Sequence, residues 1–197
     1  HKQLPPTVLS EEAGRLGLET SLFQRLSDDK NGVPAVCNPI LLDEQRRMHP
    51  SIADFPSNCF YAGRLRHQVQ DRLPIAGLPW PQQGQCRVLL LDTSGRGALE
   101  KQHGTSWGNA LEVEAVLDIA VDVLEAGYRA QQPLSADEVA IITPYAKQRD
   151  MLQAELLRRV AGAHERTSLN RHLHAALPRL RISTVDGFQG AECDLVL

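Results

Sequence analysis

Short apolar runs alternate with amphipathic stretches along the second half of this chain. Residues 88–91 and 139–142 are continuous apolar runs of strand length, and residues 180–185 and 194–197 predict two further strands. Runs that lack polar alternation are typical of strands whose two faces are both buried. Because helical stretches separate the strands, the pattern predicts an α/β fold in which helices cover a mainly parallel sheet. Ligands of such sheets bind beyond the carboxyl ends of the strands, so candidate sites follow the strands.

Two stretches between the strands have helical periodicity. Residues 110–126 predict a helix, and Gly127 stands where a C-terminal cap belongs. The polar residues of this helix fall on one stripe at helical spacing: Glu114, Asp118, Asp122 and Glu125. Residues 145–160 predict a second helix, with apolar residues on one face. Residues 71–87 and 94–108 are rich in turn-forming residues and predict loops.

The composition is that of a globular chain, since 42% of the 197 residues are hydrophobic and 23% are charged. No apolar run approaches the length of a membrane span. The net charge of −3 excludes a uniformly basic nucleic-acid binder, but residues 147–181 hold eight Lys or Arg against three acidic residues. This local excess of +5 is either a solvated helix face or a surface that follows a phosphate backbone.

The cysteines lie far apart, and none has the spacing of zinc ligands: Cys37, Cys59, Cys86 and Cys193. We therefore expect no metal site and no disulfide framework. Free thiols suit a reducing compartment, so we expect an intracellular location, cytoplasmic or nuclear or both.

The first candidate segment follows the apolar run at residues 40–42 and holds two adjacent arginines, Arg46 and Arg47. A guanidinium is always charged, and its fork of donors matches phosphate oxygens. The alternative is a surface ion pair with Asp43 or Glu44, and spacing alone favours that alternative.

Two further candidate segments follow predicted strands. Thr143 and Tyr145 offer a hydroxyl and an aromatic face that suit a phosphate and a stacked base. The alternative is a plain strand-to-helix turn. Residues 183–192 combine hydroxyls, two glycines, an amide and two carboxylates, and Glu192 could accept a bond from a sugar hydroxyl or orient a water. The alternative there is a tight turn with a helical cap.

These segments, taken in order, carry a family resemblance. The matching stretches are HKQLPP at 1–6, QRRMHP at 45–50, FPSNCFYAGRL at 55–65, ITPYAKQ at 142–148 and STVDGFQGAE at 183–192. They resemble successive motifs of superfamily 1 helicases of the up-frameshift group, which also includes senataxin-like, immunoglobulin-mu-binding-like and NFX-type zinc-finger helicases. The resemblance implies a RecA-like parallel sheet flanked by helices, the second motor domain of a P-loop NTPase. Residues 1–6 would end the first RecA-like domain, and residues 7–197 would form the second, incomplete at its C-terminus.

The resemblance also implies roles around the nucleotide. Gln3 would sense the γ-phosphate, and Arg47 would reach across the cleft to it, where a cation stabilises the charge that develops in phosphoryl transfer. Gly190 and Glu192 would face the phosphates and the ribose or the attacking water. Arg46 stands where many members have a tyrosine that packs on adenine, and a guanidinium can also stack on a purine.

A second set of roles concerns nucleic acid. The resemblance places four residues along a single strand: Thr143, Pro144, Thr184 and Val185. Ser106 and Asn109 resemble a Ser-x-x-Asn pair that has either a structural or a strand-contacting role. We expect Phe188 to be a core residue rather than a ligand.

The function that the resemblance implies is the C-terminal motor domain of an ATP-dependent RNA or DNA helicase. ATP and Mg²⁺ would be held mainly by the first RecA-like domain, since the 197 residues contain no P-loop, no Walker B motif and no motif VI. We therefore expect the 197 residues alone to be inactive. The alternatives are a non-catalytic nucleic-acid-binding module derived from a degenerate helicase and, more weakly, a carboxylate hydrolase that uses Asp186 and Glu192.

Overall fold

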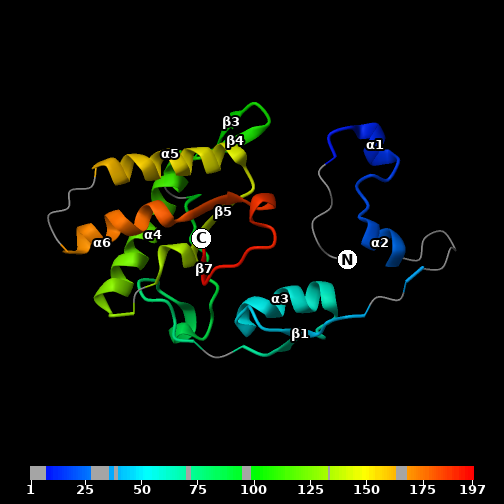
Figure 1. Ribbon diagram of the computed structural model, residues 1–197, viewed down its shortest axis with the longest axis horizontal. Coiled ribbons are helices and arrows are strands. Elements are labelled where there is room, and N and C mark those ends of the chain that lie inside the picture. The colour runs from blue at the N-terminus through cyan, green and yellow to red at the C-terminus, as the bar shows by residue number, and fades with distance from the viewer. Residues whose placement is uncertain are drawn as a thin grey trace. The chain divides into compact units, whose positions relative to one another are not determined.

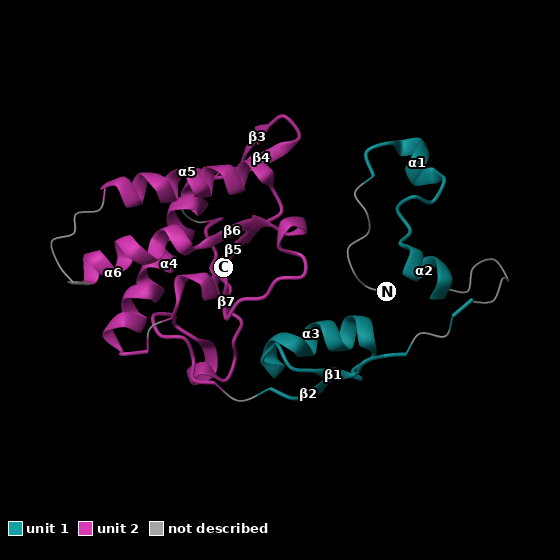
Figure 2. Cartoon of the chain, in the orientation of Figure 1, with its two compact units in different colours: residues 1–71 teal, residues 72–197 magenta. Residues whose placement is uncertain are grey.

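Two units make up the chain, residues 1–71 (unit 1) and residues 72–197 (unit 2) (Figure 2). The computed structural model describes these stretches: residues 8–27, 36–37, 40–69, 72–94, 99–132, 134–162 and 168–197. The domain boundary that the motifs place between residues 6 and 7 lies outside the described residues, so it stays a prediction. No helix in the described stretches is both long enough and apolar enough to cross a membrane.

A parallel sheet with the strand order β6-β5-β7 forms the centre of unit 2 (Figure 1). Its strands are β5 (Val139–Thr143), β6 (Arg181–Thr184) and β7 (Leu195–Val196). Parallel neighbours need a crossover, and α5 (Ala146–Gly162) and α6 (Ser168–Ala176) supply it between β5 and β6. The predicted α/β class and parallel sheet are therefore confirmed. The helix α6 was not predicted.

The core of unit 2 lies where α4 (Ala110–Arg129), α5 and α6 meet one another and the sheet. Its most deeply buried large side chains come from α4 and β5: Leu117, Val123, Leu124, Val139 and Ile141. The predicted apolar face of α5 is confirmed, since Leu152 and Leu156 are buried in this core. Short 3-10 turns connect the layers: η1 (Pro81–Gly84), η3 (Ala136–Glu138), η4 (Leu177–Arg179) and η5 (Asp186–Phe188).

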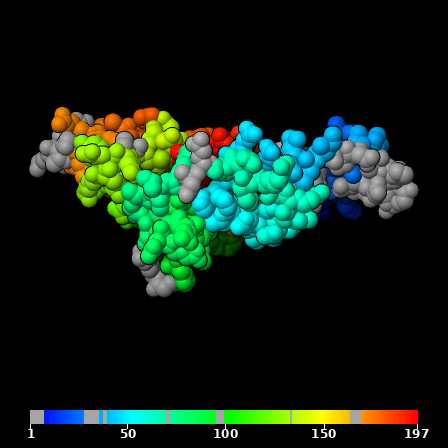
Figure 3. Space-filling view, turned by 90° about the horizontal axis from the view of Figure 1, so that it is seen from below, coloured from blue at the N-terminus to red at the C-terminus, as the bar shows by residue number. Residues whose placement is uncertain are grey.

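The helix α4 is longer than its sequence pattern predicts. Gly127 is buried inside the helix, and Ala130 is the C-cap. The predicted cap was therefore wrong, because packing on α6 extends the helix. The rings of Tyr128 and His172 lie with their centroids 4.6 Å apart, and Figure 3 shows the end of α4 (yellow-green) beside α6 (orange). Such contacts offset the cost of a helical glycine, about 1 kcal/mol.

Residues 88–91 form no strand, contrary to the prediction of a buried one. Leu90 is 90% exposed and Val88 is 51% exposed. A strand needs a ladder partner, and no described strand pairs with this segment, since β5 pairs with β6 and β7. An apolar run indicates that a segment tends to be buried. It does not indicate whether a neighbouring strand is present to pair with that segment.

The loop predicted at residues 94–108 contains an antiparallel hairpin. Its strands are β3 (Lys101–His103) and β4 (Ser106–Gly108), and the chain turns at Gly104, whose φ is +63°. A left-handed φ of this size favours glycine. Gly104 therefore marks a hairpin turn within the predicted loop.

In its described residues, unit 1 has three helices and one short parallel strand pair. Its elements are α1 (Glu11–Arg15), α2 (Leu22–Ser27), β1 (Glu44–Gln45), α3 (Pro50–Tyr61) and β2 (Arg66–His67). Residues 40–42 are not part of β1, and Ile40 and Leu42 are exposed. The helix α3 has Pro50 at its first position, where a missing N–H costs nothing.

Candidate nucleotide and nucleic-acid site

The carboxyl ends of β5 and β6 bring together the four residues predicted along a single strand. Thr143 and Thr184 are register partners, and the N–H of Val185 donates to the carbonyl of Thr143 at 3.2 Å. Pro144 is exposed, and Val185 is 43% exposed. Tyr145 follows with 37% of its surface accessible. These residues therefore form one edge of unit 2, which we call the strand-end edge.

Both threonine hydroxyls at the strand-end edge shape the turns that follow. Thr143 Oγ1 accepts from the N–H of Tyr145 at 3.3 Å, and Thr184 Oγ1 accepts from the N–H of Gly187 at 3.2 Å. Thr143 is only 6% exposed. In both bonds the hydroxyl oxygen is the acceptor, so neither bond uses the hydroxyl proton.

The loop after β6 depends on two glycines for different reasons. A Cβ at Gly187 would lie 2.7 Å from Ser183 Oγ, so the backbone packs too closely there for a side chain. Gly190 has φ +83°, and no heavy atom lies within 4 Å of the Cβ position. The backbone at Gly190 is therefore open to an approaching group, in a conformation that favours glycine.

Arg181, at the start of β6, contacts three residues of this loop. Its guanidinium lies 4.9 Å from the ring centroid of Phe188, and its Nη1 donates to the carbonyl of Glu192 at 3.3 Å and lies 3.5 Å from Cys193 Sγ. The expectation that Phe188 is a core residue was wrong, since it is half-buried beneath Arg181 rather than in the hydrophobic core. The side chain of Glu192 is exposed at the surface.

The arginine segment in unit 1 is organised by Gln45. Its Oε1 accepts from the N–H groups of Arg47 and Met48 at 3.1 and 2.8 Å. Its Nε2 donates to the carbonyl of Met48 at 2.7 Å and lies 2.8 Å from Nδ1 of His67. The candidate residues did not include Gln45, although an amide beside two arginines in a tight turn is a signal for such a role.

Arg46 and Arg47 project from this turn as exposed residues. The side chain of Arg46 is 76% exposed and forms an ion pair with Glu44 at 3.4 Å, as the surface-pair alternative predicts. Asp43 pairs instead with Arg66, at 2.9 and 3.1 Å, and this guanidinium lowers the pKa of the Asp43 carboxyl. Exposed ion pairs contribute little to stability, so the Arg46 pair can exchange for another anion.

Ser106 and Asn109 each accept hydrogen bonds from the first turn of a helix. Asn109 caps α4, since its Oδ1 accepts from the N–H groups of Leu111 and Glu112 at 3.1 and 3.3 Å. Ser106 Oγ accepts from the N–H of Lys147 in the first turn of α5 at 3.0 Å. Asn109 is 3% exposed. These contacts favour the structural role of the pair, and the strand contact stays a prediction.

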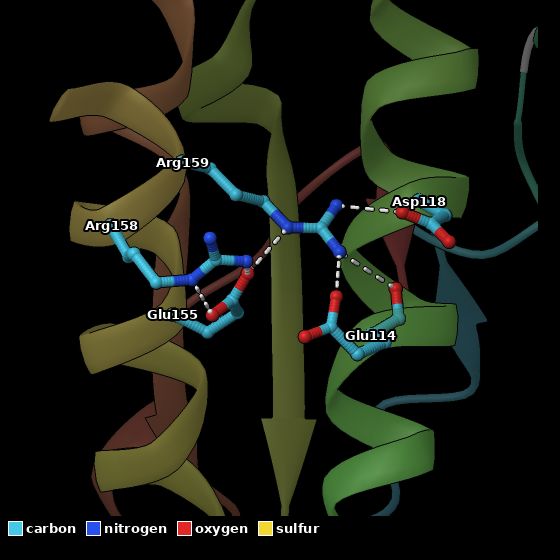
Figure 4. A network of polar contacts seen from close by, with 5 residues as sticks. All are labelled: Glu114, Asp118, Glu155, Arg158 and Arg159. Carbon is cyan, nitrogen blue, oxygen red and sulfur yellow. Dashed lines mark hydrogen bonds and ion pairs between the residues drawn. The ribbon is translucent and has the colours of Figure 1, made fainter. Parts of the chain in front are cut away.

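Much of the basic segment at residues 147–181 is neutralised within unit 2. Figure 4 shows Arg159 of α5 between Glu114 and Asp118 of α4, with Glu155 bonded to Arg159 and Arg158. Arg158 and Arg159 lower the pKa of Glu155 to about 2. Burial opposes the charge of Arg159, yet its three carboxylate partners raise the pKa of this guanidinium.

Two other arginines of the segment are also paired. Arg149 binds Asp150 at 2.7 Å, and Arg179 binds Asp137, whose carboxyl pKa the guanidinium lowers. The solvated-face interpretation therefore holds for these arginines.

The predicted nucleotide residues are divided between the units. Arg46 and Arg47 belong to unit 1, whereas Gly190 and Glu192 belong to unit 2. Gln3 lies outside the described residues. Among the described residues, no three His, Cys, Asp or Glu side chains are grouped so that they could hold a metal ion.

Known proteins match this chain along its length. Residues 18–197 match a protein family described as an AAA domain. The whole chain is 36% identical, over 199 residues, to a protein named "Regulator of nonsense transcripts 1 homolog" from Drosophila melanogaster, of which it covers 15%. It is 34% identical over 206 residues to "DNA-binding protein SMUBP-2" from Rattus norvegicus and 32% identical over 200 residues to "ATP-dependent helicase NAM7" from Saccharomyces cerevisiae.

In the latter two comparisons the whole chain is again matched, and it covers 18% of each relative. The chain thus spans less than a fifth of the length of these relatives. The matches agree with the ordered motifs and with the RecA-like parallel sheet. The chain therefore belongs to the AAA domain family and is a helicase domain of superfamily 1, similar to the regulators of nonsense transcripts.

Proposed function

We propose that this chain is the second motor domain of an ATP-dependent RNA or DNA helicase, where it closes the ATP site and grips single-stranded nucleic acid. The observation that carries the proposal is the strand-end edge, where Thr143 and Thr184 are register partners, and the loop that follows β6 leaves the backbone at Gly190 open. Adjacent parallel strands of a RecA-like sheet bind ligands at this edge. The partner across the ATP site would be the first RecA-like domain of the same protein.

Each unit, taken by itself, offers a group that suits a nucleotide phosphate. Gly190 leaves its backbone open, so a phosphate can approach closely, and Arg47 is an exposed guanidinium held at its backbone by Gln45. ATP supplies the γ-phosphoryl group whose transfer to water drives the motor. Arg47 would stabilise the charge on that group, and Glu192 would hold a sugar hydroxyl or orient a water. Gln3 would report the state of the γ-phosphate, and Mg²⁺ would be held mainly by the first domain.

The grip on nucleic acid follows from the chemistry of the strand-end edge. Hydroxyls of Thr143 and Thr184 can donate to phosphate oxygens, and exposed Pro144 and Val185 give apolar contact to sugars and bases. The accessible ring of Tyr145 offers a stacking surface, which tolerates any base. Opening and closing of two RecA-like domains would then move the strand across this edge. An intracellular location remains part of the proposal.

The test is ATP turnover by the full-length protein, measured with and without single-stranded RNA and single-stranded DNA. Arg47→Ala should reduce nucleic-acid-stimulated turnover by about 10³-fold or more and leave strand binding largely intact. The matched control is Arg64→Ala, which removes another exposed arginine of unit 1.

Three outcomes separate the possibilities. Equal turnover by Arg47→Ala and the control contradicts the role of Arg47. Strand binding without any ATP turnover by the unsubstituted protein favours the non-catalytic binding module. Stimulation by only one of the two nucleic acids identifies the substrate.

A further inference from the structure

The β3–β4 hairpin is joined to the start of α5, next to the strand-end edge. Ser106 of β4 accepts from the N–H of Lys147, and a Cβ at Gly108 would lie 2.6 Å from Met151 Sδ and 3.4 Å from Lys147 Cγ. β4 therefore packs directly on the first turns of α5, and Figure 1 shows the hairpin beside that end of the helix. Because α5 begins two residues after Pro144, the hairpin lies next to the point where the chain passes from the strand-end edge into α5.

The pairing of the hairpin decides which of its side chains face α5. Lys101 is the register partner of Gly108, and His103 is the register partner of Ser106. Directly opposed residues of an antiparallel pair share a face. Lys101 and His103 therefore lie on the same face as the two β4 residues that contact α5, whereas Gln102 and Trp107 share the other face.

Three basic residues thus gather around the junction of the hairpin and α5: Lys101, His103 and Lys147. Lys101 and His103 are exposed, and Lys147 is half-buried. Within the described residues none of the three forms an ion pair, in contrast to Arg149, Arg158, Arg159 and Arg179 of the basic segment. The positive charge of this junction is consequently available to an anionic partner.

A two-stranded hairpin is marginal by itself, and β3 has all three residues exposed, so it adds no core to unit 2. We propose that the β3–β4 hairpin extends the nucleic-acid interface: single-stranded nucleic acid leaving Thr143 and Pro144 crosses the hairpin face, where Lys101, His103 and Lys147 hold its phosphates. The inference rests on the proposed function, because it continues the same strand beyond the strand-end edge. Single-stranded nucleic acid fits because it is a flexible polyanion that can follow a narrow line of donors.

The experiment compares oligonucleotide affinity of the full-length protein with that of hairpin variants. Fluorescence anisotropy is recorded without nucleotide on a series of oligo(dT) and oligo(rU) of increasing length, at several salt concentrations. The variants are Lys101→Gln, Lys101→Glu and the double variant Lys101→Gln with His103→Gln. The matched controls are Arg129→Gln and Arg129→Glu, which make the same charge changes at an exposed residue on the far end of α4.

We expect Lys101→Gln to weaken binding of long oligonucleotides about three- to tenfold, Lys101→Glu to weaken it more, and the controls to bind as the unsubstituted protein does. Each lost phosphate contact should reduce the slope of log affinity against log salt by about 0.7. Oligonucleotides too short to leave the strand-end edge should bind all variants equally. Glu100→Gln, which removes an acidic side chain just before β3, should strengthen binding of the long ones.

Unchanged affinity and salt slope in the Lys101 variants, with normal binding by the unsubstituted protein, overturn the hairpin interface and leave the proposed function standing. Equal losses on short and long oligonucleotides also overturn it, because they indicate a general effect on the strand-end edge. A failure of the unsubstituted protein to bind any single strand overturns both proposals.

Discussion

The side chain of Gln148 is hydrogen-bonded at both ends to the backbone of Asn109. Gln148 Oε1 accepts from the N–H of Asn109 at 2.7 Å, and its Nε2 donates to the carbonyl of the same residue at 3.2 Å. Both residues are buried, at 8% and 3% exposure. Since Asn109 caps α4 and Gln148 lies in the first turn of α5, this pair sets how the two helices begin relative to each other.

Removal of this amide should lower the stability of unit 2. Gln148→Ala leaves the buried N–H of Asn109 without its acceptor, and we expect a loss of about 1–3 kcal/mol in the free energy of unfolding. Urea unfolding followed by circular dichroism measures the change. Gln153→Ala, at an exposed position of the same helix, is the control and should change stability by less than about 0.5 kcal/mol. Similar values for both variants would refute a structural role of the pair.

Acid should weaken the ion pairs that Glu155 forms with Arg158 and Arg159 on α5. The pKa of this carboxyl is about 2 in the folded chain, against an ordinary value of 4.5, because Arg158 and Arg159 favour the charged form. Its stabilising contribution is complete above about pH 5 and is lost as the pH falls towards 2. The midpoint of thermal unfolding should therefore fall over this range.

The variant Glu155→Gln isolates the contribution of this carboxylate from those of Asp43 and Asp137, whose pKa values are also lowered. The difference in unfolding midpoint between the variant and the unsubstituted chain should be largest near neutral pH and should shrink as the pH falls to 2. A difference that is constant with pH contradicts the assignment to Glu155.

The substitution Gly190→Ala should weaken nucleotide binding by more than the backbone strain at this position explains. At φ +83°, Gly190→Ala should cost about 1–2 kcal/mol of stability. Gly17→Ala makes the same change at φ +92° in unit 1, also with no heavy atom within 4 Å of the Cβ position. In the full-length protein, KM for ATP should rise for Gly190→Ala and remain unchanged for Gly17→Ala. Equal KM values would place the phosphates elsewhere.

Arg46→Tyr tests how the adenine is held. The substitution introduces the aromatic residue that the family resemblance implies at that position, and it removes an exposed pair with Glu44 that contributes little to stability. Binding of adenine nucleotides should tighten, or the preference among bases should change, because an aromatic ring replaces a guanidinium. Equilibrium binding of ATP and GTP measures both effects. If the variant binds ATP with the affinity of the unsubstituted protein, and likewise GTP, Arg46 does not stack on the base.

The amino-acid sequence by itself determined the class of the fold, the family and the order of the main elements. β5, β6 and β7 and the helices α4 and α5 were all predicted, because apolar periodicity is a local property of the chain. The motif order predicted the helicase family for the same reason, since each motif is a contiguous stretch. The strand-end edge followed from the rule that parallel strands end together, and the register of Thr143 with Thr184 agrees with it.

Only the tertiary structure decided which groups find partners. Residues 88–91 have the composition of a strand but no described strand beside them, and Gly127 stays helical because α4 packs on α6. Asn109 and Gln148 are 39 residues apart, and Ser106 and Lys147 are 41 residues apart. Periodicity and propensity carry no information over such separations, because a hydrogen bond or a ladder depends on a partner that folding alone brings into place.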